Sequence, residues 1–464
     1  MKQAGVFLVE QNISRRHFFF GTLLAGAVPP GGFGTVSSLK HLGYKSPNEK
    51  LNIAAIGAGG KGASDIAGCA GENIVALAEP DDARGEKTFK SYPNAPKYKD
   101  FRRMFDQEGK NIDAVLVSCP DHAHGSAAMW AMARGKHVYC QKPLTRTVWE
   151  AKQLTMAAAK YGVATQMGNQ GYSHPGARQC CEMIWNGDIG AVTEVHAWTD
   201  RPERYWPQGP DVAPTEQPVP STLDWNAWLA DAEPRPFSPV YLPQNWRAFP
   251  DFGCGAIGDM ACHILGTPNM AMRLTAPTSV ECIKVEGKSK YTFPYRTVIR
   301  FDFPARGAMP PLKLFWYDRV KSPPKIEGVS DGEMLGDKDN NGSLFVGEKG
   351  MITAGVFGND PRLVPAARMK DYKMPPQVLT RSPGPEKEWV RGHYRDWLRA
   401  AKGGEAACSN FSISGPFAQW MLLGVIAMRV EGKLQWDAEK MRFTNNAEAN
   451  KYLRPKFRKG WKFL

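Results

Sequence analysis

The amino-terminal third of the chain alternates short apolar runs with segments of helical periodicity. Residues 51–56, 73–78 and 113–119 are continuous apolar runs, and runs of this length bounded by turn signals are typical of fully buried strands. Because helix-like segments separate such runs, the pattern predicts parallel βαβ units. The further elements expected here are strands over 137–140 and 163–166 and helices over 126–134 and 148–161.

Later in the chain, strand-like runs follow one another without intervening helices. We expect strands over 280–285, 297–303, 312–317, 344–346 and 351–353, and helices over 392–402 and 417–430. The Gly347–Gly350 segment between the last two strands is a hairpin signal. Residues 200–250 are rich in Pro and Trp with little periodicity. This segment predicts a long ordered insertion over the mouth of a site, because long loops in compact domains are commonly functional.

The first strand runs directly into a glycine-rich turn, Gly57-Ala58-Gly59-Gly60-Lys61-Gly62. This is G-x-G-x-x-G in the strand-then-helix setting that indicates dinucleotide binding. Gly57 permits the tight turn, Gly59 lets the backbone approach a pyrophosphate, and Gly62 lets the helix pack close to the strand. Gly60 lies with the unpaired amides at the helix start, which face the phosphates. We therefore expect a Rossmann domain that binds a dinucleotide.

The second strand ends in Glu79, about twenty residues after the glycine turn, the spacing at which an acid binds the ribose. A carboxylate at this place accepts hydrogen bonds from ribose hydroxyls and repels a 2′-phosphate. NAD is therefore favoured over NADP, although Arg84 follows closely and could offset the preference.

The third strand ends at the turn Pro120-Asp121-His122-Ala123-His124. Open α/β sheets bind ligands at the carboxyl ends of their strands, so we assign Pro120 and His124 to cofactor contact. Two histidines and an aspartate so close together also suggest a metal, but no fourth ligand is apparent nearby. Helix capping and cofactor contact explain the turn equally well, and no metal site is predicted.

The amino terminus has the features of an export signal. Ser14 to Phe20 reads SRRHFFF, and the eleven-residue apolar run from Phe18 to Val28 is followed by Pro29 and Pro30. A twin-arginine pair before a short apolar run is typical of the export route that carries folded proteins. We expect a periplasmic protein, and no stable membrane insertion, because eleven residues cannot span a bilayer.

Composition narrows the class of protein further. The 464 residues allow two or three domains, and 42% apolar residues exclude a disordered chain. The net charge of +13 is concentrated partly in the first fifty residues, which hold six Lys or Arg against two acids. The rest has no basic stripe, so no nucleic-acid partner is expected. The nine cysteines form no CxxC pair, and we predict neither a disulfide framework nor a zinc site.

Two distant segments carry side chains suited to acid–base chemistry. Lys142 precedes Pro143 at a strand end, and proline holds its predecessor extended, so the ammonium can project into the crevice. Much later, Asp259 and His263 are four residues apart in a predicted helix, which places both on one face. A histidine beside a hydroxyl can take or return a proton, and a carboxylate can orient the histidine or bind another substrate hydroxyl. A capping aspartate with a packed histidine is the alternative interpretation.

Together these motifs resemble the glucose-fructose oxidoreductase/inositol dehydrogenase/MocA family, written Gfo/Idh/MocA. The resemblance spans roughly residues 50 to 430 and includes MGNQG at 167–171, LDWNAWL at 223–229, NWRAF at 245–249 and GDMACHILG at 258–266. It is closest to exported bacterial members. It implies a Rossmann domain followed by an α/β domain with an open, mainly antiparallel sheet. We place the signal and linker at 1–45, the NAD-binding domain at 46–168, the substrate and oligomerisation domain at 169–390, and carboxyl-terminal helices and tail at 391–464.

The resemblance also implies functional residues. The family's motif lysine carries over to Lys142, and its aspartate and histidine to Asp259 and His263. The usual Glu-Lys-Pro is Gln141-Lys142-Pro143 here, and a neutral Gln cannot form an ion pair with the lysine. Gln141 and Lys142 are expected at the cofactor, and the substrate residues are expected to be Asn169, Tyr172, Arg247 and His263. The polar turn at Asn169 and Tyr172 and the Trp-rich loop at Arg247 are equally compatible with structural roles.

The sequence thus predicts an exported NAD-dependent oxidoreductase that acts on a secondary hydroxyl of a sugar, glycoside or polyol and forms a homo-oligomer. The first alternative is an NAD-dependent glycoside hydrolase that works by transient oxidation, elimination and re-reduction. The second is a non-catalytic sugar-binding protein. The identity of the sugar and the choice of Lys142 or His263 as the base stay open at this point.

Overall fold

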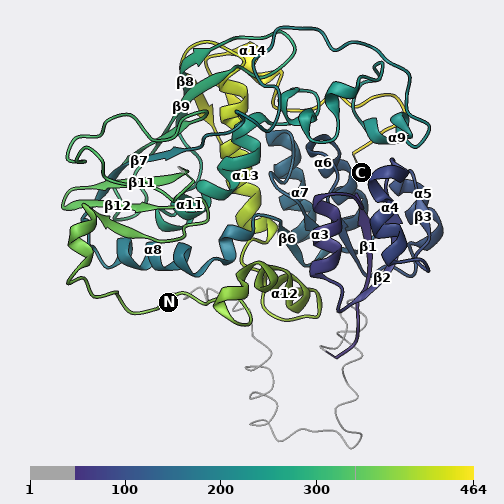
Figure 1. Ribbon diagram of the computed structural model, residues 1–464, viewed down its shortest axis with the longest axis horizontal. Coiled ribbons are helices and arrows are strands. Elements are labelled where there is room, and N and C mark those ends of the chain that lie inside the picture. Colours follow the sequence, from purple (N-terminus) through teal and green to yellow (C-terminus); the bar gives the residue numbers. More distant parts are fainter. Residues whose placement is uncertain (1–47, 340, 464) are drawn as a thin grey trace, which may run out of the picture.

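The computed structural model describes residues 48–339 and 341–463 (Figure 1). The twin-arginine segment and the rest of the predicted signal, 1–45, lie outside the described residues. Within residues 48–339 and 341–463, each helix is too short or too polar to span a lipid bilayer.

The amino-terminal domain is built on a six-stranded sheet in the order β3-β2-β1-β4-β5-β6, in which every pair is parallel. Its central strands are buried, and they carry the apolar runs from which they were predicted. This is the expected Rossmann arrangement. The strands are β1 (Asn52–Ile56), β2 (Asn73–Ala78), β3 (Lys97–Tyr98), β4 (Ala114–Val117), β5 (His137–Cys140) and β6 (Thr165–Met167).

Five helices connect these strands, and local sequence explains where they begin and end. In α7 (Val148–Tyr161), Thr147 and Glu150 form a capping box and Gly162 ends the helix in the left-handed conformation. Helix α6 (Asp121–Met132) begins five residues earlier than predicted, directly after Pro120. The expected turn is therefore a helix start, which a preceding proline and a first-turn aspartate both favour. The others are α3 (Lys61–Gly68), α4 (Asp82–Ser91) and α5 (Phe101–Glu108).

The second domain is built on a nine-stranded mixed sheet in the order β13-β12-β11-β7-β10-β9-β8-β14-β15. Only β10 and β7 pair in parallel; the other pairs are antiparallel. The predicted hairpin is present, with Gly347 opposite Gly350. The strands are β7 (Val192–Trp198), β8 (Ser279–Glu286), β9 (Arg296–Phe303), β10 (Leu312–Tyr317), β11 (Gly342–Gly347), β12 (Gly350–Ala354), β13 (Arg362–Val364), β14 (Leu434–Asp437) and β15 (Arg442–Phe443).

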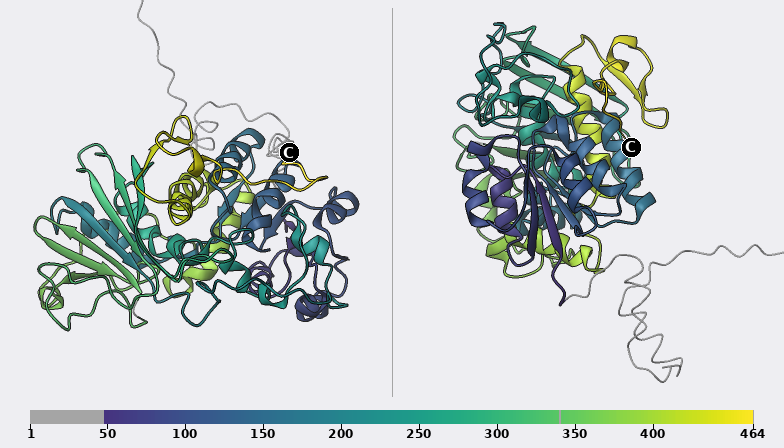
Figure 2. Two further views of the ribbon diagram at one scale, coloured as in Figure 1. Left: turned by 90° about the horizontal axis from the view of Figure 1, so that it is seen from above. Right: turned by 90° about the vertical axis from the view of Figure 1, so that its right-hand side faces the viewer.

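Helices from the end of the chain join the two domains. Helix α13 (Phe411–Ala427) is buried over most of its surface and packs against α7 on one side and the second sheet on the other (Figures 1 and 2). Helix α12 (Trp389–Ala401) places Tyr394 and Trp397 in one apolar cluster with Ile53 and other residues of the first sheet. The carboxyl-terminal segment thus belongs to the cores of both domains.

Several helices of the second domain were not predicted from the sequence. Helix α8 (Pro175–Trp185) follows the last Rossmann strand and leads into β7, and α11 (Gly266–Ala271) packs against it. A short α14 (Ala447–Asn450) precedes the carboxyl-terminal tail.

The Pro- and Trp-rich segment around 202–252 forms a compact layer with its own apolar cluster, which includes Trp206, Trp225, Trp228 and Trp246. It contains α9 (Trp225–Leu229) and the single turns η3 (Pro239–Tyr241) and η4 (Asn245–Ala248). The segment lies against the loop after β2, where backbone bonds join Asp82 to Thr222 and Asp224 to Pro80. It therefore covers the carboxyl ends of the Rossmann strands.

Candidate active site

The glycine turn between β1 and α3 is closely packed. Gly57 has a φ of 88°, and its amide donates to the Ala78 carbonyl. A Cβ on Gly62 would lie 2.1 Å from the Gly57 carbonyl oxygen, so a larger residue would push α3 away from the turn. No side chain caps the amino terminus of α3, so the amides there that do not donate to a backbone carbonyl, as Gly62 and Ser64 do, are available to an anion.

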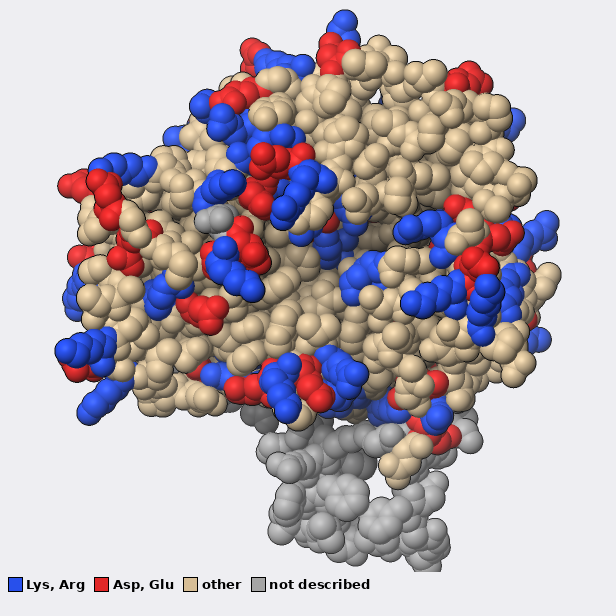
Figure 3. All heavy atoms as spheres, viewed as in Figure 1, with Lys and Arg blue, Asp and Glu red and all other residues tan. Residues whose placement is uncertain are grey.

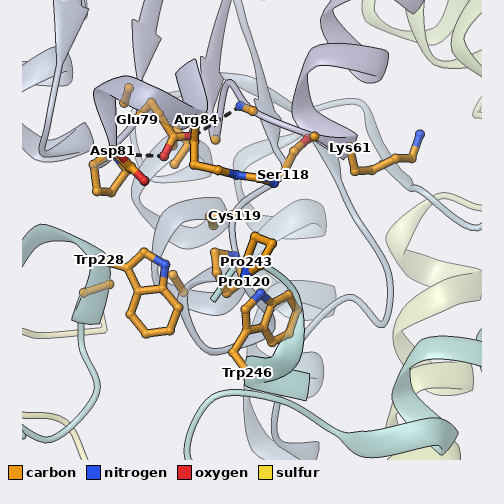
Figure 4. A pocket seen from close by; sticks show the side chains of 18 of the residues that line it. Lys61, Glu79, Asp81, Arg84, Ser118, Cys119, Pro120, Trp228, Pro243 and Trp246 are labelled. Atoms are coloured by element: carbon orange, nitrogen blue, oxygen red, sulfur yellow. Dashed lines mark hydrogen bonds between the residues drawn. The ribbon is translucent and has the colours of Figure 1, made fainter. Parts of the chain in front are cut away.

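A cavity of about 320 Å³ lies between this turn and the 202–252 layer (Figure 4). Trp228 and Trp246 form the wall opposite Glu79, Arg84 and Lys61. Of the residues predicted to contact the cofactor, only Gly62 does not line the cavity, because it packs behind the turn. Those on the wall are Gly57, Gly59, Gly60, Glu79, Pro120, His124, Gln141 and Lys142.

Glu79 is held at the turn by three backbone amides. Its carboxylate accepts bonds from Ala58 (2.9 Å), Gly59 (3.2 Å) and Asp81 (3.2 Å). Burial raises the pKa of Glu79, although these hydrogen bonds lower it in part. Arg84 is exposed beside the turn, with its guanidinium next to Gly60. A narrow glycine turn, an open helix start and an acid at the end of β2 fit the pyrophosphate and ribose of a dinucleotide.

Lys142 is the side chain at which two cavities meet. It lines the first cavity and also a second, more polar one of about 750 Å³ that opens toward the second domain. Its ammonium donates to the Asp259 carboxylate at 2.6 Å and to the Asp259 carbonyl at 2.9 Å. The lysine and the aspartate, far apart in sequence, are thus in direct contact as an ion pair.

Asp259 binds three cations rather than one. Besides Lys142, Arg247 Nε donates to it at 3.0 Å and Arg201 lies at 3.2 Å. Burial by itself would raise the pKa of this carboxyl, but Lys142, Arg247 and Arg201 together outweigh burial and hold the pKa well below its usual range. The three surrounding cations therefore favour the ionised form of Asp259.

The expectation that Asp259 orients His263 is not supported by the structure. The segment Ile257–Ala261 is a π-helix, followed by α10 (Cys262–Ile264), so the geometry of one α-helical face does not hold. The carboxylate points to the three cations, and the His263 Nδ1 has no hydrogen-bond partner among the described residues. The alternative, that Asp259 serves a substrate hydroxyl, stays a prediction.

His263 lines the second cavity with Lys142 and Asp259. Its ring packs edge-on against Phe357 at 5.3 Å between centroids. Burial, followed by the charge of Lys142, holds the pKa of His263 well below its ordinary value, with Asp259 opposing. The imidazole is therefore neutral near neutral pH.

The second cavity is rich in polar and charged side chains, and Figure 3 shows Lys and Arg gathered around a hollow near the middle of the molecular face. The guanidinium of Arg201 packs over the Tyr205 ring, with its Cζ 3.9 Å from the ring centroid. The residues that line it from the second domain include Asp200, Arg204, Lys321, Asp337 and Asn341. Such a surface suits a ligand with many hydroxyl groups.

Two predicted substrate residues are not on either cavity. Tyr172 is buried, and its hydroxyl accepts a bond from Asn269 at 2.6 Å. Asn169 is fully buried and accepts a bond from Ser409. The structure gives both side chains contacts within the core behind the site, whereas Arg247 and His263 do lie on cavity walls.

The sequence analysis did not assign three residues that line the cavities of the site. Arg201 follows β7, itself unpredicted, and Trp228 lies in the insertion. Asp121 is 4% exposed on the first cavity, and burial, only partly offset by Arg247 and Lys142, raises its pKa to about 7. Its position directly before His122 at a strand end was a usable signal. No group of three or more metal-ligating side chains occurs within residues 48–339 and 341–463.

Comparison with protein families gives two consecutive matches. Residues 51–169 match the Gfo/Idh/MocA oxidoreductase family, NAD-binding Rossmann fold, and residues 196–291 match the carboxyl-terminal α/β domain of the same oxidoreductase family. These two segments contain the glycine turn, Lys142, and Asp259 with its partners Arg201 and Arg247.

Individual relatives are distant. An uncharacterized oxidoreductase of Schizosaccharomyces pombe is 25% identical over 47% of this chain and 50% of its own length. Inositol 2-dehydrogenase of Serratia proteamaculans is 25% identical over 50% of this chain and 76% of its own. The chain therefore spans only about half the length of the first of these relatives.

Solved structures share the fold. An inositol dehydrogenase homolog of Azotobacter vinelandii, complexed with NADH and myo-inositol, has a TM-score of 0.53 at 16% identity, covering 85% of this chain and 100% of that one. A levoglucosan dehydrogenase complexed with NADH and levoglucosan has a TM-score of 0.55 at 17% identity, covering 83% and 99%. At such low identity the likeness concerns the fold alone.

Proposed function

Because this chain belongs to the Gfo/Idh/MocA oxidoreductase family, we propose that it is an NAD-dependent oxidoreductase acting on a secondary hydroxyl of a sugar, glycoside or polyol. The observation that carries the proposal is the place of Lys142, at the junction of the nucleotide cavity and the polar second cavity. A substrate carbon bound beside this ammonium would lie next to the nucleotide cavity. Its hydroxyl groups would lie among the polar side chains of the second cavity. When bound, NAD supplies the hydride acceptor.

The ammonium of Lys142 is positioned as a hydrogen-bond donor to the reacting oxygen. The carboxylate and the carbonyl of Asp259 take two of its donor directions, at 2.6 Å and 2.9 Å. An ammonium has three donors, so one remains for the substrate. Arg201 and Arg247 fix the carboxylate from its other sides, and this geometry holds the lysine in place before substrate binds.

His263 is the group we assign to accept the hydroxyl proton. Its imidazole is neutral, since burial and the charge of Lys142 lower its pKa, and a neutral imidazole has one nitrogen free to accept. The charged lysine then stabilises the negative charge that develops on the oxygen as the proton leaves. The two side chains thus have different roles, donor for Lys142 and acceptor for His263.

The relatives support the substrate class. Inositol 2-dehydrogenase and levoglucosan dehydrogenase both occur among the similar proteins, and their names describe oxidation of a polyol and of an anhydrosugar. The second cavity of this chain, with its mixed acidic and basic lining, is compatible with ligands of that kind.

A substitution at Lys142 tests the assignment. Lys142→Ala is expected to lower kcat by about 10²–10³-fold, the range for loss of a donor to a developing negative charge, with NAD binding retained. NADH formation is followed by absorbance while a panel of sugars, polyols and aryl glycosides is screened. The exposed Lys110 provides the control, and Lys110→Ala is expected to keep wild-type rates. Near-normal turnover in both Lys142→Ala and His263→Ala would contradict the assignment.

The NAD-dependent glycoside hydrolase stays the second candidate because the cofactor cavity is covered. The 202–252 layer forms one of its walls, and Arg458 of the carboxyl-terminal tail binds that layer. Such a cover suits a cofactor that is retained and recycled within one turnover. Release of an aglycone from an aryl glycoside without net NADH favours this candidate; steady NADH accumulation favours the dehydrogenase. Saccharide binding with neither product favours a non-catalytic protein.

We also propose export by the twin-arginine route and assembly as a homo-oligomer. The export proposal rests on Arg15 and Arg16 before the apolar run. Arg15→Lys/Arg16→Lys is expected to retain the protein in the cytoplasm, as measured by fractionation. Equal periplasmic content in wild type and variant would refute the route. Light scattering of the purified protein tests the oligomer.

A further inference from the structure

A buried carboxylate lies behind the lysine and takes no part in the proposed chemistry. Asp65 on α3 is fully buried, yet it receives bonds from four side chains. Lys61 Nζ (2.6 Å) and Tyr394 OH (2.7 Å) donate to Oδ1, and Ser118 Oγ (2.7 Å) donates to Oδ2. The fourth donor is Gln141 Nε2, which lies 3.1 Å and 2.9 Å from the two oxygens.

Gln141 connects this carboxylate to the active site. While its Nε2 donates to Asp65, its Oε1 accepts a bond from the Lys142 backbone amide at 3.3 Å. The Gln141 side chain is 4% exposed and is confined by Gly168, where an added Cβ would lie 2.6 Å from Nε2. The amide therefore has one orientation in which both of its ends are bonded.

This arrangement explains the Gln in place of the family's Glu. A side chain at 141 must donate toward Asp65 and accept from the Lys142 amide at the same time, and a carboxamide does both. An ionised carboxylate only accepts, and it would face the oxygens of Asp65. The negative charge that the usual motif carries at this strand end is thus carried here by Asp65 on the neighbouring helix.

We propose that Asp65 is a positioning residue for Lys142, acting through Gln141 as a matched carboxylate–amide pair. The inference rests on the proposed function for the role of Lys142. The pair joins the helix after the glycine turn to the strand end that carries the lysine, and Tyr394 adds α12 to the same network. The glycine turn and Lys142 are therefore held in place by one set of hydrogen bonds.

Exchanging the carboxylate and the amide between positions 65 and 141 tests whether they act as a matched pair. Gln141→Glu is expected to lower kcat at least tenfold at neutral pH, because two facing carboxyl groups cannot both ionise without repulsion. Asp65→Asn is expected to lower kcat as well, since Lys61 loses its anionic partner and one of the two accepting oxygens is replaced by an NH2 donor that faces the Gln141 amide. The double variant Asp65→Asn/Gln141→Glu has one carboxyl and one amide again, and is expected to recover most of the rate. Gln153→Glu, on α7, is the control.

The pH profile separates positioning from a general loss of folding. In Gln141→Glu, one of the two facing carboxyl groups must be protonated to avoid repulsion, and protonation becomes easier as the pH falls. The NAD affinity and kcat of this variant, relative to wild type, are therefore expected to rise as the pH falls from 8 toward 5. The other titratable groups facing Asp65 are Lys61, Tyr394, Tyr139 and Cys69, and they are the same in all variants. The double variant is expected to return to the wild-type profile.

The readouts also distinguish failure of this inference from failure of the proposed function. NAD affinity, measured by quenching of Trp fluorescence, and the thermal unfolding temperature need no substrate. If wild type oxidises no sugar, the proposed function fails, and the pH profile of NAD affinity still decides the pairing. An unchanged profile in Gln141→Glu, or a double variant no better than the poorer single variant, would overturn the inference.

Discussion

Asp259 shows how one side chain takes a role that its sequence position does not indicate. The four-residue spacing to His263 suggested a carboxylate that orients an imidazole, but the carboxylate binds Lys142, Arg201 and Arg247 instead. These four side chains carry three positive charges and one negative charge, within a cavity whose wider lining is mixed. Such a site favours a substrate oxygen that becomes negative during reaction.

Burial of a histidine makes the stability of the folded protein depend on pH, and His122 is an example. His122 lies between Trp228 and Phe252 and bonds the Trp228 carbonyl at 3.0 Å. Burial lowers its pKa to about 3. Because the unfolded chain takes up this proton near pH 6.5 and the folded protein does not, the contribution of His122 to stability falls as the pH drops from about 6.5 toward 3.

His122→Gln removes that contribution and can still donate to the carbonyl. The free-energy advantage of wild type over the variant is expected to shrink by about 1.4 kcal/mol per pH unit between pH 6 and 4. Urea unfolding at several pH values measures this difference, with the exposed Lys110→Gln as control. A difference between wild type and His122→Gln that does not change with pH would contradict the prediction.

At the scale of elements, strands and helices with clear local signals were predicted well. Strand β5 and helix α7 have the predicted bounds, because a short apolar run defines the strand and a capping box and Gly162 define the helix. The π-helix at Ile257–Ala261 and the unpredicted β7 have no comparable end signals, whereas the unpredicted α8 has a start signal in Pro175 and the capping His174 that the sequence analysis did not use. The conformation of the π-helix and of β7 depends on packing between the two domains, which no local pattern records.

The element that binds the cofactor can be tested through its closest contact. Gly62→Ala places a Cβ 2.1 Å from the Gly57 carbonyl oxygen, so α3 must shift away from the turn. NAD affinity, measured by titration calorimetry, is expected to fall by about tenfold or more, roughly 1.4 kcal/mol. Gly71→Ala, where a Cβ meets nothing within 4 Å, is the matched control. Equal NAD affinity in both variants would mean that the turn tolerates the displacement.

At the scale of the whole molecule, the tail fastens the insertion to the Rossmann domain. Arg458 donates to Asn226 at 2.8 Å and 2.9 Å, and its amide donates to the Asp231 carbonyl. Three residues later, Trp461 packs edge-on against Phe101 and stacks on the Arg102 guanidinium at 4.0 Å. The tail therefore contacts both the cover of the cofactor cavity and the domain beneath it.

Loss of this contact is expected to speed cofactor release. Arg458→Ala removes the bonds to Asn226 but leaves the cavity walls intact, so the NAD dissociation rate is expected to rise several-fold in stopped-flow fluorescence. Lys459→Ala changes the exposed neighbour and is expected to leave the rate as in wild type. A lower unfolding temperature with an unchanged dissociation rate would show that the tail stabilises the fold without controlling release.

The sequence by itself determined the Rossmann domain, the glycine turn and the NAD preference expected from Glu79, since these depend on local periodicity and short spacings, and the family resemblance pointed to Lys142. Only the tertiary structure decided that Asp259 is the counterion of Lys142, that Asp65 bonds Gln141, and that Tyr172 lies in the core. The reason is physical: hydrogen bonds and ion pairs act over about 3 Å in space, and chain folding sets which distant residues come that close.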